Sequence, residues 1–308
     1  MTNLHTAVEE YVGIRRALGF KLQRDLRLLN DFVDFIESEG TTTLTTELAL
    51  RWSMLPSESD PGWWWCRLSI VRCFARYMSA IDPSTEIPPM GLLAKGDRRA
   101  TPYLYSDAEV VSLLAAARTM RNALAGATCE TLIGLLAVTG MRIGEALRLN
   151  RTDVDWARGL LSVSHSKFDK SREIPLHSST LDALAAYERS RDERCPHPKT
   201  PSFFVSNAGS RLTVTNIDMK FRRLLCIAGI SPQSPQCRPH VHSLRHSFAC
   251  RTLEEWYRRG VDVQPLLPIL STYLGHSAPS STYWYISGKP ELMALAAERL
   301  ETSLGVLP

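Results

Sequence analysis

The stretch "TGMRIGEALRL", Thr139 to Leu149, places a charged pair at the boundary between two predicted helices. Gly140 ends a buried helix, "CETLIGLLAVTG", since glycine readily takes the left-handed conformation that closes helices. Arg142 and Glu145 stand at the start of the next helix, three residues apart, so their side chains can pair. Taken alone, this pattern is more typical of a surface ion pair than of a functional site.

Three further stretches in the second half place cations, imidazoles or phenols at element boundaries. The first, "HSKFDKSREIPL", is predicted to form a β-hairpin whose polar turn gathers Lys167, Lys170 and Arg172. A basic hairpin is commonly just solvated. Its shape also suits reaching a nucleic-acid groove and bringing a lysine to a leaving group.

The second of these stretches, "HVHSLRHSFACRTL", begins a half-buried helix. His242 and Arg245 are three residues apart and share one face of it, whereas we expect His246 and Arg251 to point elsewhere. A His-x-x-Arg pattern is a weak signal by itself, but polar groups on a half-buried helix need partners.

The third stretch, "LGHSAPSSTYWYISG", carries His276, Tyr283 and Tyr285. Tyrosine is an unusual nucleophile because its phenol has a pKa near ~10. The ordinary interpretation is a structural histidine and two tyrosines that pack under a C-terminal helix. On a helix, residues two apart point roughly 200° away from each other, so both tyrosines cannot face one phosphate.

The charge of the 308-residue chain is unevenly distributed. Residues 1–100 carry 12 Lys+Arg and 13 Asp+Glu, net −1, which leaves 24 and 19, net +5, for residues 101–308. An anion-handling site is therefore expected in the second part. No apolar run approaches the roughly 20 residues of a membrane span and no signal peptide is evident, so we expect a cytoplasmic protein without membrane attachment.

We expect neither a metal nor another cofactor. The sequence has no carboxylate cluster for Mg²⁺, no Walker loop and no nucleophile elbow, and its seven cysteines form no CxxC pair. Two arginines, a lysine, two histidines and a tyrosine suit metal-free phosphoryl transfer, in which guanidiniums bind the nonbridging oxygens. We expect the same cations to lower the pKa of the tyrosine.

Periodicity and composition predict a mainly α protein with a small antiparallel β-sheet. Residues 1–81 are predicted to be a helical domain, residues 82–103 a linker rich in proline, glycine and charge, and residues 104–308 a second domain with a tail helix. In the first domain Arg72 and Arg76 share a helix face, which is either solvated or in contact with phosphates. The apolar stripe of the tail either packs on its own domain or docks on a neighbouring protomer.

The order and spacing of the four stretches resemble the tyrosine recombinase (phage integrase) family, in its Xer-like form. "TGMRIGEAL" resembles the first-arginine box, "HSKFDKSREIPL" the β-hairpin lysine box, "HSLRHSFA" the His-x-x-Arg box and "LGHSAPSSTYWY" the final box. The resemblance covers Tyr103 to about Leu300. In the final box the nucleophile follows the histidine by nine residues, which selects Tyr285 over Tyr283.

The resemblance implies a catalytic set, supported by Glu145: Arg142, Lys167, His242, Arg245, His276 and Tyr285. Tyr285 would attack the scissile DNA phosphate, giving a 3′-phosphotyrosine and a free 5′-hydroxyl. The two arginines would hold the nonbridging oxygens, and Lys167 would protonate the leaving oxygen. His242 would assist proton transfer, and His276 would hydrogen-bond the phosphate.

The resemblance further implies a two-domain architecture in which residues 1–81 form a core-DNA-binding (SAM-like) domain. The implied partners are double-stranded DNA and further copies of the chain, as a homotetramer on two sites. Candidate DNA contacts outside the catalytic set are Arg72, Arg76, Lys170 and Arg172. The implied function is site-specific recombination for integration, excision or transposition. A type IB topoisomerase and a non-catalytic DNA-binding regulator on the same scaffold remain open at this point.

Overall fold

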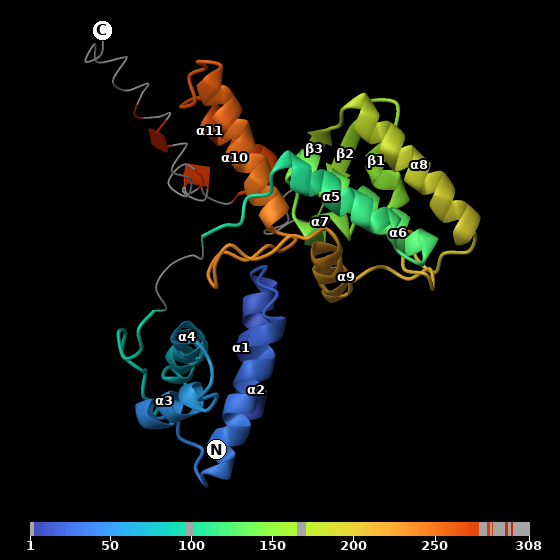
Figure 1. Cartoon of the computed structure of the whole chain (residues 1–308). Coiled ribbons are helices and arrows are strands. Elements are labelled where there is room, and N and C mark those ends of the chain that lie inside the picture. The colour runs from blue at the N-terminus through green and yellow to red at the C-terminus, as the bar shows by residue number, and fades with distance from the viewer. Residues whose placement is uncertain are drawn as a thin grey trace. The chain divides into compact units, whose positions relative to one another are not determined.

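The computed structural model describes residues 3–95, 101–164 and 171–276, and six later residues: Thr282, Tyr283, Tyr285, Met293, Ala294 and Ala297. The chain divides into two compact units, Met1–Arg99 and Ala100–Pro308 (Figure 1). Helices dominate both units, and the second also holds a small antiparallel sheet. The predicted fold class is therefore confirmed.

The described part of the first unit contains the helices α1 (Leu4–Ala17), α2 (Gln23–Ser38), α3 (Thr46–Met54) and α4 (Pro61–Met78). Asn3, Thr45 and Asp60 start three of them by accepting hydrogen bonds from backbone N–H groups of the first turn. The apolar faces meet in one core, in which the rings of Phe32 and Trp52 lie 5.1 Å apart.

Arg72 of α4 does not lie on an open face. Its side chain is buried, and its guanidinium donates to the carbonyl oxygens of Pro88 (2.7 Å) and Pro89 (2.9 Å). The prediction of a phosphate contact at Arg72 overlooked that the proline-rich segment 82–95 packs on this unit, where its carbonyls need donors. Arg76, one turn later, is exposed.

The second unit holds a sheet of three strands in the order β1 (Val154–Asp155), β2 (Leu160–Val163) and β3 (Arg172–Pro175). All neighbours are antiparallel, and Leu161 pairs with Ile174 in the β2–β3 hairpin. The hairpin strands were predicted from their alternation, whereas β1 is too short to show any. The part of the predicted polar turn that carries Lys167 and Lys170 lies outside the described residues.

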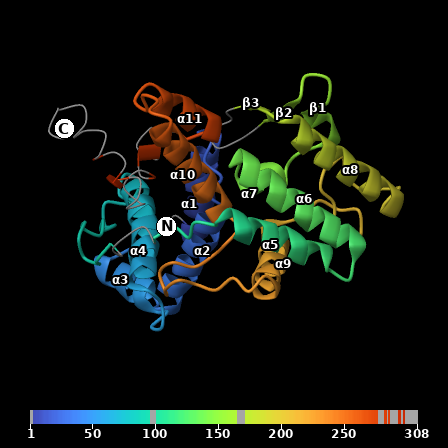
Figure 2. The ribbon, with the colours of Figure 1, turned by 45° about the horizontal axis from the view of Figure 1, so that its top comes forward.

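The helices of this unit are α5 (Asp107–Arg118), α6 (Ala123–Thr139), α7 (Ile143–Ala146), α8 (Ser178–Arg194), α9 (Val214–Ile227), α10 (Ser243–Arg258) and α11 (Leu266–Leu274), and η1 (Arg151–Asp153) is a short 3-10 helix. A capping box formed by Ser106 and Glu109 starts α5. α5 packs along α6 in both views (Figures 1 and 2). No helix in the described ranges is long and apolar enough to cross a membrane.

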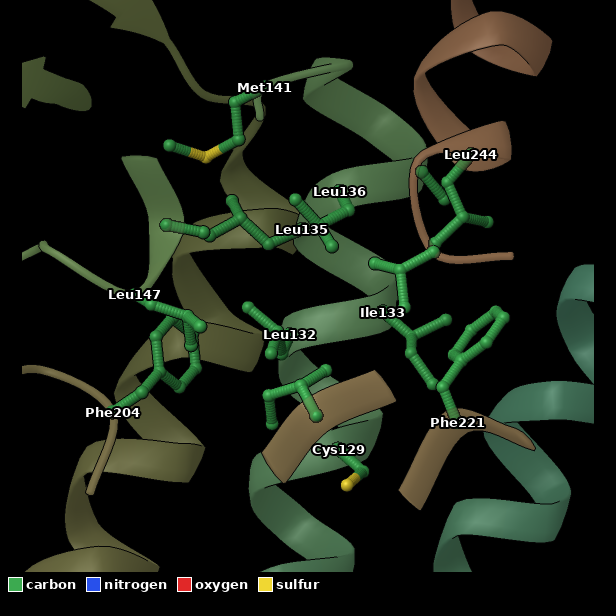
Figure 3. Close-up of a cluster of buried hydrophobic side chains, with 14 of the residues drawn as sticks. Cys129, Leu132, Ile133, Leu135, Leu136, Met141, Leu147, Phe204, Phe221 and Leu244 are labelled. Atoms are coloured by element: carbon green, nitrogen blue, oxygen red, sulfur yellow. The ribbon is translucent and has the colours of Figure 1, made fainter. Parts of the chain in front are cut away.

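α6 runs through the core of the second unit and buries side chains all around its axis. Leu132, Ile133 and Leu136 point into a cluster that Phe221 of α9 and Leu244 of α10 complete (Figure 3). A helix that is buried over most of its surface shows no amphipathic period, which agrees with the buried helix predicted here. Because α6 is fixed in this way, the turn that follows it is a rigid place for charged side chains.

A second cluster joins α10 to α11, which lie side by side in both views (Figures 1 and 2). Leu253 of α10 and Leu267, Leu270 and Leu274 of α11 form it, and Tyr285 packs into the same cluster. The burial of Tyr285 therefore depends on the packing of these two helices.

Candidate active site

Arg142 stands at the start of α7, directly after the turn that ends α6. Gly140 makes this turn with a φ of 59°, and an added Cβ there would collide with the Phe248 ring. The Glu145 carboxylate reaches back and accepts hydrogen bonds from the Arg142 backbone N–H (3.0 Å) and from its Nη1 (2.9 Å). The pair predicted from the sequence is thus formed, at a site where the carboxylate is buried.

Glu145 is shared between two arginines. Its carboxylate also accepts hydrogen bonds from Arg172 Nη2 (2.8 Å) and Nη1 (3.3 Å). Burial alone would raise the pKa of Glu145, but the hydrogen bonds from Arg172 and from the Arg142 backbone outweigh it and lower the pKa to about 2. At neutral pH Glu145 is therefore a fixed anion between two guanidiniums.

The C-terminal end of α11 gathers three arginines from separate parts of the chain. Each donates to a different one of three successive carbonyls: Arg172 Nε to Tyr273 O (2.7 Å), Arg245 Nη2 to Leu274 O (2.7 Å) and Arg142 Nη2 to Gly275 O (2.8 Å). Carbonyls at a helix end lack partners within the helix and carry the negative end of its dipole. The end of α11 therefore sets the positions of all three guanidiniums.

Arg245, in the first turn of α10, is almost wholly buried at 2% exposure. Besides Leu274 O, its guanidinium donates to Gly140 O (2.9 Å), so it joins the ends of α6 and α11. Burial, and then the charge of Arg142, lowers the pKa of Arg245 to about 10. The group is still a cation at neutral pH.

Tyr285 lies against this cluster and is 3% exposed, whereas Tyr283 is 48% exposed. Both residues have helical backbone, and residues two apart on a helix point in nearly opposite directions. The Tyr285 ring stacks on His276, with ring centroids 5.9 Å apart, and is tilted against His246 at 5.5 Å. The structure therefore places only Tyr285 among the cations and imidazoles.

The pKa of Tyr285 is raised overall, because burial outweighs the lowering by the cations that the sequence predicted. Burial raises it most, while Arg245 opposes this through its charge and a hydrogen bond. In the free protein the phenol is protonated at neutral pH. To act as a nucleophile it has to pass its proton to a base during attack.

Three imidazoles that can accept a proton lie at the site: His246 and His276 contact the Tyr285 ring, and His242 contacts His246. Burial first, and then neighbouring arginines and imidazoles, lowers the pKa of His242 to about 4, of His246 to about 3 and of His276 to about 4. All three are neutral at pH 7. A hydrogen bond of 2.8 Å between His276 Nδ1 and the buried Thr282 hydroxyl orients the His276 ring.

These histidines make the stability of the protein sensitive to acid. Their folded pKa values lie below the ordinary 6.5, so the unfolded chain binds protons more tightly. Stability that is present above pH 6.5 is expected to fall as the pH drops from 6.5 towards 4. Urea denaturation at pH 7, 6 and 5 measures this loss. His246→Phe keeps a ring but cannot bind a proton, so this variant is expected to lose less stability than the wild type as the pH falls. An equal loss of stability would contradict the lowered pKa of His246.

One group in the described part of the chain could hold a metal ion: His5, Asp34 and Glu37, in the first unit. His5 Nε2 lies 3.1 Å from Asp34 and 3.8 Å from Glu37, and the carboxylates are exposed. We interpret this group as a surface ion pair that links α1 to α2.

A family model described as the phage integrase family matches residues 104–291. The chain belongs to the phage integrase family. The resemblance seen in the four sequence stretches is thereby confirmed.

Similar chains are found among known proteins and solved structures. An integrase/recombinase of Sinorhizobium fredii, y4rB, is 44% identical over an alignment of 307 positions, and the match covers 98% of each chain. The XerH recombinase in a post-cleavage complex with its difH substrate superposes with a TM-score of 0.65 at 19% identity, covering 90% of this chain and 78% of that one. A lambda integrase tetramer bound to a Holliday junction gives 0.63 at 18% identity, covering 92% and 77%. Both structures share the fold of this chain.

In the structure, most of the predicted set comes together near Tyr285: Arg142, Glu145, His242, Arg245 and His276. Lys167 and Lys170 lie outside the described residues, as does the predicted stripe of the tail helix. Arg172 was predicted as a DNA contact, but its side chain is 11% exposed and bonded to Glu145. The prediction failed because the guanidinium turns from the hairpin into the protein, where a buried carboxylate needs it.

The sequence-based prediction missed two residues of this site. His246 was expected to point away, yet its ring lies 4.9 Å from that of His242 and contacts Tyr285. It follows His242 by four residues, a spacing that puts both on one helix face and was overlooked. Thr282 is the second, and nothing in its spacing indicates a bond to His276.

Proposed function

We propose that this chain is a site-specific DNA recombinase that breaks and rejoins strands through a covalent 3′-phosphotyrosine at Tyr285. One observation carries the proposal: the phenol of Tyr285 is buried against Arg245 and stacked on His276, beside the cation Arg142. A buried phenol next to fixed guanidiniums suits in-line attack on a phosphodiester.

In the proposed cleavage step, the Tyr285 oxygen bonds to phosphorus while the bond to the 5′-oxygen breaks. The N–H groups of Arg142 and Arg245 that face the substrate bind the two nonbridging oxygens. Because carbonyls already hold both guanidiniums, they need little rearrangement when charge builds up on phosphorus.

Protons move in both directions in this step. His242 assists the loss of the phenol proton, and the neutral state of its imidazole at pH 7 supports that role. Lys167 protonates the leaving 5′-oxygen, as the resemblance implies. His276, held by Thr282, hydrogen-bonds the phosphate.

In rejoining, a 5′-hydroxyl of another strand attacks the phosphotyrosine and releases Tyr285, so the bond energy is retained without ATP. We propose double-stranded DNA as the partner and a homotetramer as the active assembly in the cytoplasm. XerH bound to difH and the lambda tetramer on a Holliday junction support this. Residues 1–81 are proposed to bind core DNA, with Arg76 and Lys170 as phosphate contacts.

Trapping covalent adducts on DNA from around the coding gene tests the proposal. The full chain is incubated with a fragment library of that region, adducts are isolated, and their junctions are sequenced. We expect one recurrent site with the protein on the 3′ side of the break. Absence of any adduct refutes the proposal. Adducts at scattered sequences, together with relaxation of plasmid lacking a site, would instead indicate a topoisomerase.

A further inference from the structure

The side chain of Arg172 makes its hydrogen bonds to other parts of the protein. Its Nε donates to Tyr273 O at 2.7 Å, and both terminal nitrogens donate to Glu145, at 3.3 and 2.8 Å. With 11% of its side chain exposed, it offers DNA little surface. The residue joins strand β3 to the end of α11 and to α7.

Arg142 is bonded at the same two places, the Glu145 carboxylate and the C-terminal end of α11. Its Nη1 donates to Glu145 at 2.9 Å and its Nη2 to Gly275 O at 2.8 Å, while 29% of its side chain is exposed. Thus Arg142 is the more open of the two guanidiniums, and its orientation depends on the carboxylate and on the helix end. Arg172 is bonded to both of these parts.

Gly275 shows how closely the two guanidiniums approach the helix end. Its φ is 68°, and a Cβ added there would lie 2.7 Å from Arg172 Nη1 and 3.4 Å from Arg142 Nη1. Only glycine fits this position without displacing a cation. The contact leaves Arg172 and the end of α11 little room to move separately.

We propose that Arg172 is a positioning residue, which aligns Arg142 with the scissile phosphate by fixing Glu145 and the end of α11. This inference rests on the proposed recombinase function of the same site. A lysine cannot replace it, because one ammonium does not reproduce a planar fork that bonds a carboxylate and a carbonyl together.

A double-mutant cycle on DNA cleavage tests the role. Arg172→Gln and Glu145→Gln are each expected to slow single-turnover adduct formation about 100-fold, since a small displacement of a substrate-binding group costs roughly that much. Because Arg172 acts in part through Glu145, the double variant is expected to lose clearly less than the product of the two single losses. DNA affinity and its salt dependence are expected to stay unchanged.

Two further variants sharpen the comparison. Arg172→Lys keeps the charge and is expected to remain as slow as Arg172→Gln. Arg158→Gln is the matched control, since Arg158 precedes β2 of the same sheet and pairs with the exposed Glu173; it is expected to cleave normally. Thermal unfolding of each variant verifies that it is folded at the assay temperature.

A measurement without DNA tests the positioning role of Arg172 independently of the recombinase function. Side-chain ¹⁵N NMR of the Arg142 guanidinium reports whether rotation about its terminal bonds is restricted. Restricted Arg142 signals in the wild type are expected to broaden in Arg172→Gln and to persist in Arg158→Gln. If the wild type forms no adduct but these signals behave as expected, only the recombinase function fails.

Several results would overturn the positioning role. Multiplicative losses in the double variant would show that Arg172 acts independently of Glu145. Weaker DNA binding with a smaller salt dependence in Arg172→Gln would make it a direct phosphate contact. Full activity of Arg172→Lys, or unchanged Arg142 signals in Arg172→Gln, would equally refute it.

Discussion

Tyr285→Phe is expected to abolish covalent attachment to a nicked suicide substrate, by at least about 10⁴-fold, because it removes the only atom that can bond to phosphorus. The change deletes one oxygen and keeps the ring, so the stacking on His276 and the contact with His246 are retained. Denaturing electrophoresis of labelled DNA measures the adduct. DNA binding, followed separately by gel shift, is expected to stay within a few-fold of the wild type.

Tyr283→Phe provides the control two residues away. Its side chain is 48% exposed and points away from the site, so the adduct is expected to form at the normal rate. Loss of the adduct in Tyr283→Phe and its retention in Tyr285→Phe would exchange the two assignments. Retention in both variants would exclude tyrosine catalysis at this helix.

Arg245→Ala is expected to slow cleavage about 10³-fold, comparable to the loss of one preorganised donor to a transition-state oxygen. The same change is also expected to reduce the stability of the protein. Gly140 O and Leu274 O lose a donor in a buried setting, so the variant is also expected to unfold at a lower temperature. Single-turnover cleavage at a temperature well below that transition isolates the catalytic part.

Arg251→Ala, on the same helix, is the matched control for this change. Arg251 is half exposed and pairs with the exposed Asp107, so its loss is expected to leave cleavage unchanged. A uniform loss of DNA binding in Arg245→Ala, with normal cleavage of the DNA that does bind, would reduce Arg245 to a phosphate anchor.

The sequence predicted those parts of the site that are local in the chain. The helix end at Gly140, the Arg142–Glu145 pair and the helix that carries Arg245 all follow from spacing and capping within a few residues. The same holds for the opposed directions of Tyr283 and Tyr285. Periodicity on one element suffices for such features.

The contacts that join distant segments were not predictable from the sequence. No pattern in "SREIPL" indicates that Arg172 turns inward to a glutamate 27 residues earlier, or that Arg72 is used by proline carbonyls. The raised pKa of Tyr285 was missed for a related reason, because charge can be counted in a sequence whereas burial cannot. In each case tertiary packing decided how a charged or polar group is used.

The low exposure of Tyr285 also affects which acceptor completes the reaction. A phosphotyrosine in open solvent would meet water at roughly 55 M, and hydrolysis would leave a broken strand with no energy left to reseal it. At 3% exposure, among rings and the aliphatic cluster of α10 and α11, water has little access to this side chain. A DNA hydroxyl delivered by base pairing arrives already oriented, at a high effective concentration. The packing that raises the pKa of the phenol thus also favours transfer to a DNA strand over hydrolysis of the phosphotyrosine.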